Sequence, residues 1–209
     1  MESNTTTQPS AMRNLFYHLV ALFVVIVWGV TFVNTRVLVD AGLNPQDVFL
    51  LRFTIAYICI WFISPRKVFC GNWKDEVMML MLGVLGGSLY FITENYAVKL
   101  TYVNDVSFIA NTSPLLTVII ALMFSKKVKF SWMLAIGSIM ALIGLGFVIF
   151  KDHFELNIKS LGDLLALAAA ISWAFYSLLI KKAADRYSSV FITRKVFIYG
   201  VLTTLPMYL

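Results

Sequence analysis

The chain alternates between long apolar stretches and short polar ones. The apolar stretches have about 20 residues each, the length that a helix needs to cross a bilayer, and they lack the two-residue alternation of a membrane β-strand. Helices are expected because no backbone group can stay unpaired in hydrocarbon. The pattern predicts seven spans, at 15–37, 48–64, 77–98, 102–125, 130–150, 162–180 and 190–209.

The first span has a second copy later in the chain. Aligning 19–40 with 164–185 places Ala21 on Ala166, Trp28 on Trp173 and Asp40 on Asp185. After a contraction of three residues the match resumes, with 48–52 on 190–194, so that Arg52 falls on Arg194. A repeat of this period indicates one five-span unit followed by the start of another.

Composition agrees with a membrane protein. Hydrophobic residues make up 60% of the chain and charged residues 13%, whereas a soluble domain has about 25% charged residues. The net charge of +6 does not indicate a nucleic-acid partner, because the basic residues lie in short clusters between spans. The two cysteines and two histidines form neither a disulfide framework nor a metal site.

The distribution of basic residues predicts the orientation. The N-terminal tail and loops 2, 4 and 6 hold ten lysines and arginines, against four in loops 1, 3 and 5. The positive-inside rule therefore places the N-terminus in the cytoplasm. Because five is odd, span 6 crosses the membrane opposite to span 1, and the two units are inverted. Inverted repeats are typical of secondary transporters, although duplication can also give non-transporting proteins.

These features define the predicted organisation. The fold class is all-α, a polytopic membrane helix bundle with an inverted five-helix repeat. Residues 1–13 are expected to be a disordered cytoplasmic tail, 14–150 the first unit, 151–161 an external loop, and 162–209 an incomplete second unit of two spans.

Several short motifs resemble EamA-type carriers of the drug/metabolite transporter superfamily. They are Trp28-Gly29-Val30-Thr31-Phe32 in the first span, Arg52 in the second, Leu82-Gly83 to Ala97 in the third, Ser107–Ala110 and Ser113–Thr117 in the fourth, and Gly137 and Gly144–Gly146 in the fifth. The resemblance covers 15–209. One departure is Ser125-Lys126, where such carriers often have Gly-Glu.

The resemblance implies ten spans in two inverted units and ATP-independent export or uptake of small metabolites by alternating access. It also implies residence in a membrane, expected to be the bacterial inner (plasma) membrane. Spans 8 to 10 are absent, so the chain is interpreted as a carrier truncated at its C-terminus, which need not transport by itself. The expected partners are a small-molecule substrate, a coupling proton or ion, and the lipid bilayer, with no nucleic acid and no cofactor.

Polar and aromatic residues inside the spans are the candidates for the substrate pathway, because each is costly in hydrocarbon unless partnered. Arg52, Glu94 and Asp105 have similar predicted depths, which suggests an ion-paired cluster near the external mouth; Asp105 is more simply an interfacial residue that snorkels outward. The pathway candidates are Trp28, Arg52, Tyr90, Glu94, Asn95, Asn111, Trp173 and Tyr176. All of them could instead serve helix packing or interhelical hydrogen bonds.

Proline and glycine suggest structural roles. Pro114 frees the carbonyl of Ala110, so it is a hinge candidate or a tolerated membrane proline. Gly83, Gly87, Gly137, Ala141 and Gly144 are interpreted as close-packing surfaces.

Other classes fit less well. A nucleotide-binding Gly-rich loop is absent from the sequence, and no nucleophile–base pairing or other catalytic set occurs at mid-depth, so an enzyme is not expected. A seven-span receptor-like protein would have an external N-terminus and no five-span repeat. A truncated fragment without transport activity remains an alternative.

Overall fold

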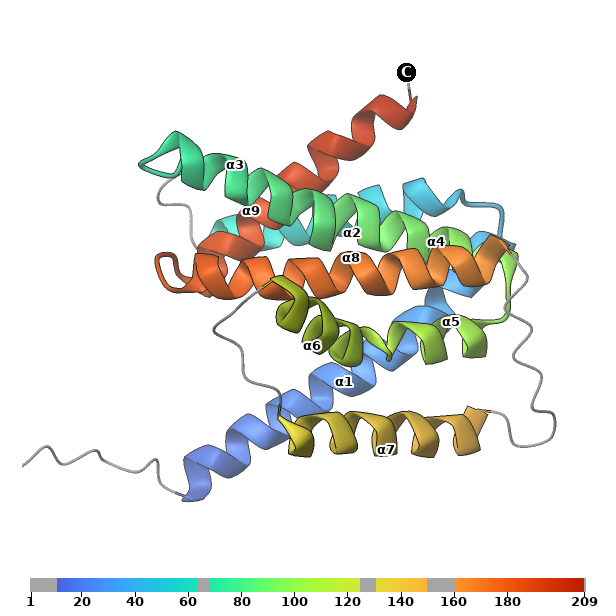
Figure 1. Ribbon diagram of the computed structural model, residues 1–209. Helices are drawn as coiled ribbons and strands as arrows, with labels where there is room; N and C mark the ends of the chain where they lie inside the picture. The colour runs from blue at the N-terminus through green and yellow to red at the C-terminus, as the bar shows by residue number, and fades with distance from the viewer. Residues whose placement is uncertain (1–10, 64–67, 125–130, 150–160, 209) are drawn as a thin grey trace, which may run out of the picture.

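The computed structural model describes residues 11–63, 68–124, 131–149 and 161–208, and within these ranges every regular element is helical. The α-helices are α1 (Ala11–Asp40), α2 (Pro45–Ile63), α3 (Trp73–Gly83), α4 (Tyr90–Leu100), α5 (Val103–Ala110), α6 (Ser113–Phe124), α7 (Trp132–Ile149), α8 (Leu161–Ala184) and α9 (Ser189–Thr204). A π-helix, η1 (Val84–Leu89), joins α3 to α4, and a 3₁₀-helix, η2 (Leu205–Tyr208), follows α9. Figure 1 shows α3, η1 and α4 as one continuous segment, here called the α3–α4 rod (Trp73–Leu100).

In the described part of the chain, six helical segments are long and apolar enough to span a membrane, which confirms the predicted polytopic helical bundle. They are Asn14–Asp40, Pro45–Ile63, Trp73–Leu100, Val103–Phe124, Leu161–Ala184 and Ser189–Tyr208. The predicted span 130–150 corresponds to α7 (Trp132–Ile149), which contains the apolar stretch Ala135–Gly144.

Two of the predicted domain boundaries can be compared with the start of a described helix. α1 begins at Ala11, inside the predicted disordered tail, and residues 1–10 lie outside the described part of the chain. The predicted external loop, 151–161, also lies outside it, apart from Leu161, where α8 begins.

Side chains at the ends of the spans satisfy the free backbone groups of the helices. The Asn72 side chain accepts a hydrogen bond from the Lys74 amide at the start of α3, and Ser188 accepts one from the Phe191 amide at the start of α9. Asn and Ser are favoured at this position because a helix leaves its first amides unpaired. Gly42 has φ of 100° in the turn between α1 and α2, a conformation that favours glycine.

α8 packs against the α3–α4 rod through a face of small residues, and the two run alongside each other in Figure 1. The buried alanines on this helix are Ala166, Ala169, Ala170, Ala174 and Ala183. Gly162 lies so close to Thr101 that a β-carbon there would be 2.8 Å from the Thr101 side chain. Small residues let membrane helices approach closely, where dispersion contacts and interhelical hydrogen bonds replace a hydrophobic driving force.

The two ends of the bundle bring together different loops. At the end where α4 finishes, here called the α4 end, Thr101 contacts Gly162 and the Tyr208 hydroxyl donates to Asp47. At the end where α3 begins, here called the α3 end, Asp75 pairs with Arg186. Among the described residues, the end of α4 and the starts of α2 and α8 therefore lie at one end of the bundle, and the start of α3 and the residues after α8 at the other, as expected for helices that cross a membrane in alternation.

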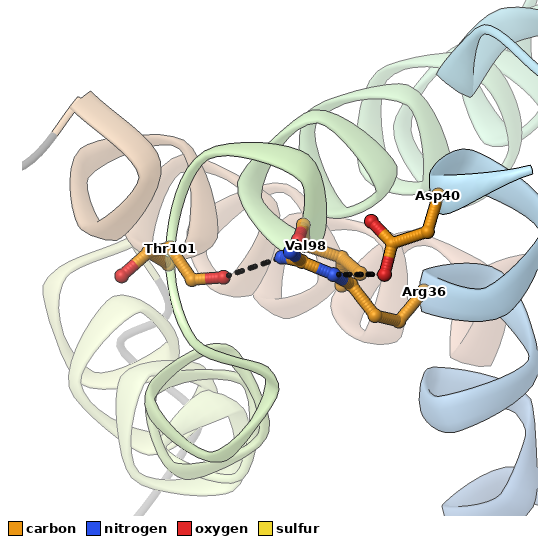
Figure 2. Close-up of polar contacts among 4 residues, drawn as sticks. All are labelled: Arg36, Asp40, Val98 and Thr101. Carbon is orange, nitrogen blue, oxygen red and sulfur yellow. Dashed lines mark hydrogen bonds and ion pairs between the residues drawn. The ribbon is translucent and has the colours of Figure 1, made fainter. Parts of the chain in front are cut away.

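Arg36 joins α1 to the α4 end of the rod. Its Nη1 donates to the carbonyls of Val98 at 2.9 Å and Thr101 at 3.5 Å, and its Nε donates to Asp40 at 3.0 Å (Figure 2). The last carbonyls of a helix have no partner within the helix, and a cation there also interacts favourably with the helix dipole. One guanidinium therefore fixes where α1 meets the rod.

We expect Arg36→Met to lower the free energy of unfolding by about 1–2 kcal/mol, since charge-assisted hydrogen bonds to partly buried carbonyls are lost. Asp40→Asn should cost about 0.5 kcal/mol or less, because Asp40 is exposed and only its surface pair with Arg36 is removed. Denaturation in detergent micelles measures both changes. Equal losses in the two variants would contradict the role assigned to the carbonyl contacts.

Candidate functional site

Four of the predicted pathway residues lie together around Trp173. The Trp173 ring is 4.8 Å from Tyr90 on α4, 5.0 Å from Tyr176 on α8 and 6.4 Å from Trp28 on α1, measured between ring centroids. The Trp28 and Trp173 rings meet edge to face at 87°, a preferred aromatic geometry. We call Trp28, Tyr90, Trp173 and Tyr176 the aromatic group; it brings together helices from both predicted units.

A buried carboxylate adjoins the aromatic group. The Tyr90 hydroxyl donates to Oε1 of Glu94 at 2.5 Å, one turn further along α4, and Glu94 is only 9% exposed. A carboxylate at this depth is expensive unless hydrogen bonds and opposite charge stabilise it. Tyr90 therefore links the carboxylate to the aromatic rings.

Arg52 on α2 supplies the opposite charge without forming a direct ion pair. Its positive charge attracts the negative charge of the Glu94 carboxylate. Its Nη1 donates to the Thr35 hydroxyl on α1 at 2.8 Å. Its Nη2 is buried and has no hydrogen-bond partner in the described part of the chain. Of the predicted cluster of Arg52, Glu94 and Asp105, the first two attract each other, whereas Asp105 lies near the like charge of Asp163, which repels it.

Asn95, another of the predicted pathway residues, forms part of the contact between α4 and α2. It is 2% exposed, and its Nδ2 donates to the carbonyl of Pro45 at 3.1 Å. Tyr96 makes a parallel contact by donating to Gln46 at 2.8 Å. These bonds fix α2 beside the rod and leave the Asn95 amide engaged in packing.

Asn111 and Pro114 lie at a break in the predicted fourth span, between α5 and α6. Asn111 is exposed, and its Nδ2 donates to the carbonyl of Ser107 at 2.7 Å. The Ser113 hydroxyl donates to the Ala110 carbonyl at 2.5 Å, which satisfies the carbonyl that Pro114 frees. A cavity of about 460 Å³ between this break and α7 is lined by Asn111, Pro114 and Gly137, and it includes no member of the aromatic group.

The π-helix η1 was not predicted from the sequence. It ends at Leu89, immediately before Tyr90, and Ser172 on α8 donates to the carbonyl of Leu85 at 2.7 Å. Gly86 lies beneath the Tyr176 ring, where a β-carbon would be 2.3 Å from Cδ2. π-helical turns inside α-helices frequently occur at functional sites, and here the turn sets the position of the aromatic group. In the sequence, the adjacent glycines Gly86 and Gly87 were the feature that could have indicated this π-helical turn.

The described residues contain no group of three or more His, Cys, Asp or Glu side chains that could hold a metal ion. The site offers aromatic faces, a carboxylate and a partly unpaired guanidinium. Such a set can bind an organic solute through its apolar body and a polar group.

Comparison with known proteins identifies the family. The model of the EamA-like transporter family matches residues 15–150. The chain belongs to this family. Its predicted resemblance to EamA-type carriers is therefore confirmed, and the matched residues include Trp28, Arg52, Tyr90 and Glu94 of the site.

Two curated relatives, both named "Uncharacterized transporter", come from Archaeoglobus fulgidus. One is 23% identical over 183 residues, which cover 87% of this chain and 62% of the relative. The other is 24% identical over 199 residues, which cover 92% of this chain and 66% of the relative. The chain thus spans about two thirds of the length of these relatives. A solved crystal structure shares the fold, with a TM-score of 0.65 and 18% identity over 91% of this chain and 65% of that one.

The close approach of Gly86 and Tyr176 gives a prediction. Gly86→Ala should lower the free energy of unfolding by about 1–3 kcal/mol, since the new methyl group overlaps the Tyr176 ring and α8 must shift. The matched control is Gly144→Ala, where a β-carbon would meet no described residue within 4 Å. Denaturation in detergent compares the two, and equal stability would show that η1 does not hold Tyr176 closely.

Proposed function

We propose that this EamA family chain forms part of a secondary transporter that moves small organic metabolites across a bacterial inner (plasma) membrane by alternating access. The observation that carries the proposal is the buried Glu94 carboxylate, hydrogen-bonded to Tyr90 beside Trp173. Ionisable residues within membrane spans are expensive and mark substrate or ion paths. Family membership and the names of the relatives support a transporter rather than an enzyme.

In this proposal the aromatic group contacts the apolar body of the solute, and Glu94 with Arg52 recognises its polar end. The buried Nη2 of Arg52 supports this role, since it has no partner among the described residues and a solute acceptor would satisfy it. The carboxylate of Glu94 also provides a group that can take up and release a coupling proton. The contact between Trp28 and Trp173, which the repeat pairs, supports a path between two inverted units.

We expect Glu94→Gln to reduce transport at least tenfold while membrane abundance is unchanged, because the amide cannot exchange a proton or carry charge. The solute is found first, by metabolite profiling of cells that lack or overproduce the full chain, and transport is then measured as efflux. The control, Asp185→Asn, removes an exposed carboxylate outside the site and should leave efflux within twofold. Unchanged efflux in Glu94→Gln and in Trp28→Ala would exclude this site.

The proposed orientation places the N-terminus and the α3 end in the cytoplasm. A tag at the N-terminus should therefore react with an impermeant reagent only after the membrane is opened. Labelling of the tag in intact cells would reverse the topology and would instead favour a seven-span receptor-like arrangement.

A further inference from the structure

At the α3 end, the first turn of α3 carries two adjacent acids whose cation and tyrosine partners come from the second unit. Each acid binds one cation and one tyrosine hydroxyl. Asp75 binds Arg186 and Tyr187, and Glu76 binds Lys195 and Tyr199. We call these six residues the inner latch.

The Asp75 arm holds the loop between α8 and α9. Arg186 Nη1 donates to Oδ1 of Asp75 at 2.9 Å, and the Tyr187 hydroxyl donates to Oδ2 at 2.9 Å, so that both carboxylate oxygens are used. Asp75 is 9% exposed, although Arg186 is largely in contact with solvent. The hydrogen bond to Asp75 raises the pKa of Tyr187 to about 12, so its hydroxyl keeps its proton and remains a donor.

The Glu76 arm holds α9 itself. Lys195 and Tyr199 both donate to Oε1 of Glu76, and the Cys70 amide donates to Oε2 at 2.8 Å. Lys195 is 3% exposed, and its ammonium lies 5.1 Å from the centroids of the Phe69 and Tyr199 rings. The ammonium is therefore enclosed by one carboxylate and aromatic faces, which favour a desolvated cation.

Beyond the latch, apolar side chains of α3 and α9 pack in a buried cluster, and further along the rod the two backbones come close at glycines. A β-carbon on Gly87 would lie 3.1 Å from Cα of Gly200, and one on Gly83 would lie 2.4 Å from Cβ of Tyr199. Backbones in such close contact can tilt against each other about the glycines. The latch joins the two helices at the α3 end of this same interface, next to the glycine contacts about which they can tilt.

A buried ion pair is weak evidence for stability, because desolvation offsets much of its attraction, but breaking one partner is costly. Such a pair is suited to separating two discrete states. We propose that the inner latch is the cytoplasmic gate of the transport path, and that α3 separates from α9 at this end when the path opens inward. The gate rests on the proposed transport function and adds to it the residues that close the path.

Cys70 provides a native reporter for the latch. Its thiol lies against Glu76 and Tyr187, and burial together with the hydrogen bond to Glu76 raises its pKa to about 11, which slows its reaction with thiol reagents. The other cysteine, Cys59, is exposed and is removed by Cys59→Ser. Reaction of the full chain with an impermeant maleimide in inside-out vesicles then measures access to the latch.

We expect Asp75→Asn to speed the labelling of Cys70 at least fivefold, because it frees Arg186 and Tyr187 without removing the carboxylate that contacts the thiol. Asp185→Asn, in the same loop, is the matched control and should leave the rate unchanged. Equal rates in Asp75→Asn and the unmodified latch would overturn the proposal, as would labelling from the external side of the membrane.

Cross-linking distinguishes a gate, which must open during transport, from a contact that stays closed and only stabilises the fold. In the Cys59→Ser background, Tyr187→Cys is joined to Cys70 by a short bis-thiosulfonate, which a reductant removes. A gate predicts that efflux falls at least tenfold on cross-linking and returns with reductant, whereas undiminished efflux would overturn the gate and leave transport intact. If the full chain shows no efflux before cross-linking, the proposed function fails and the gate fails with it.

Discussion

A carboxylate in a membrane-spanning helix must find a cation or hydrogen-bond donors, and the α3–α4 rod carries three such groups. Asp75 and Glu76 find theirs on α9 and the loop before it, and Glu94 finds Tyr90 within the rod and the charge of Arg52 on α2. The cost of leaving any of these acids unpaired exceeds most single packing contacts. The rod therefore determines which helices surround it, and at which ends they meet it.

The π-helix explains how one rod serves two sets of partners. Each residue of an α-helix turns the chain by about 100°, and a π-turn takes up about one extra residue. Tyr90 and Glu94 therefore lie on a different face from the one that a regular helix continuing from α3 would give them. Ser172 and Tyr176 on α8 contact this turn at Leu85 and Gly86. α8 therefore packs against the rod at the turn where the direction of the rod's side chains shifts.

The sequence predicted the features that depend on hydropathy and on the repeat. The spans and the bundle follow from apolar length, and the internal match pairs Trp28 with Trp173, although their ring contact is seen only in the structure. The break at Asn111–Thr112 and the π-turn depend on local hydrogen bonds that hydropathy does not report. Asn95 was a pathway candidate by composition, yet its amide is used by the Pro45 carbonyl, a contact between segments 50 residues apart.

The inner latch was missed for a different reason. Asp75 and Glu76 lie in the polar stretch just before the predicted third span, 77–98, where exposed acids are ordinary. Arg194 and Lys195, however, stand inside the apolar run of the last span. Two adjacent cations inside a predicted span are a signal that acidic partners exist elsewhere, and the latch contains the partner of one of them.

The aromatic group and the inner latch are mechanically connected through α8. Trp173 and Tyr176 lie on the same helix whose C-terminal loop carries Arg186 and Tyr187, and a helix moves largely as a rigid body over this length. In the proposed gate, release of Asp75 frees that loop, and any tilt of α8 against the rod changes how Trp173 and Tyr176 face Tyr90. Since Tyr90 donates to Glu94, the same motion alters the hydrogen bond that stabilises the buried carboxylate. A solute held at Glu94 and the state of the latch would thus influence each other through one helix, as alternating access requires.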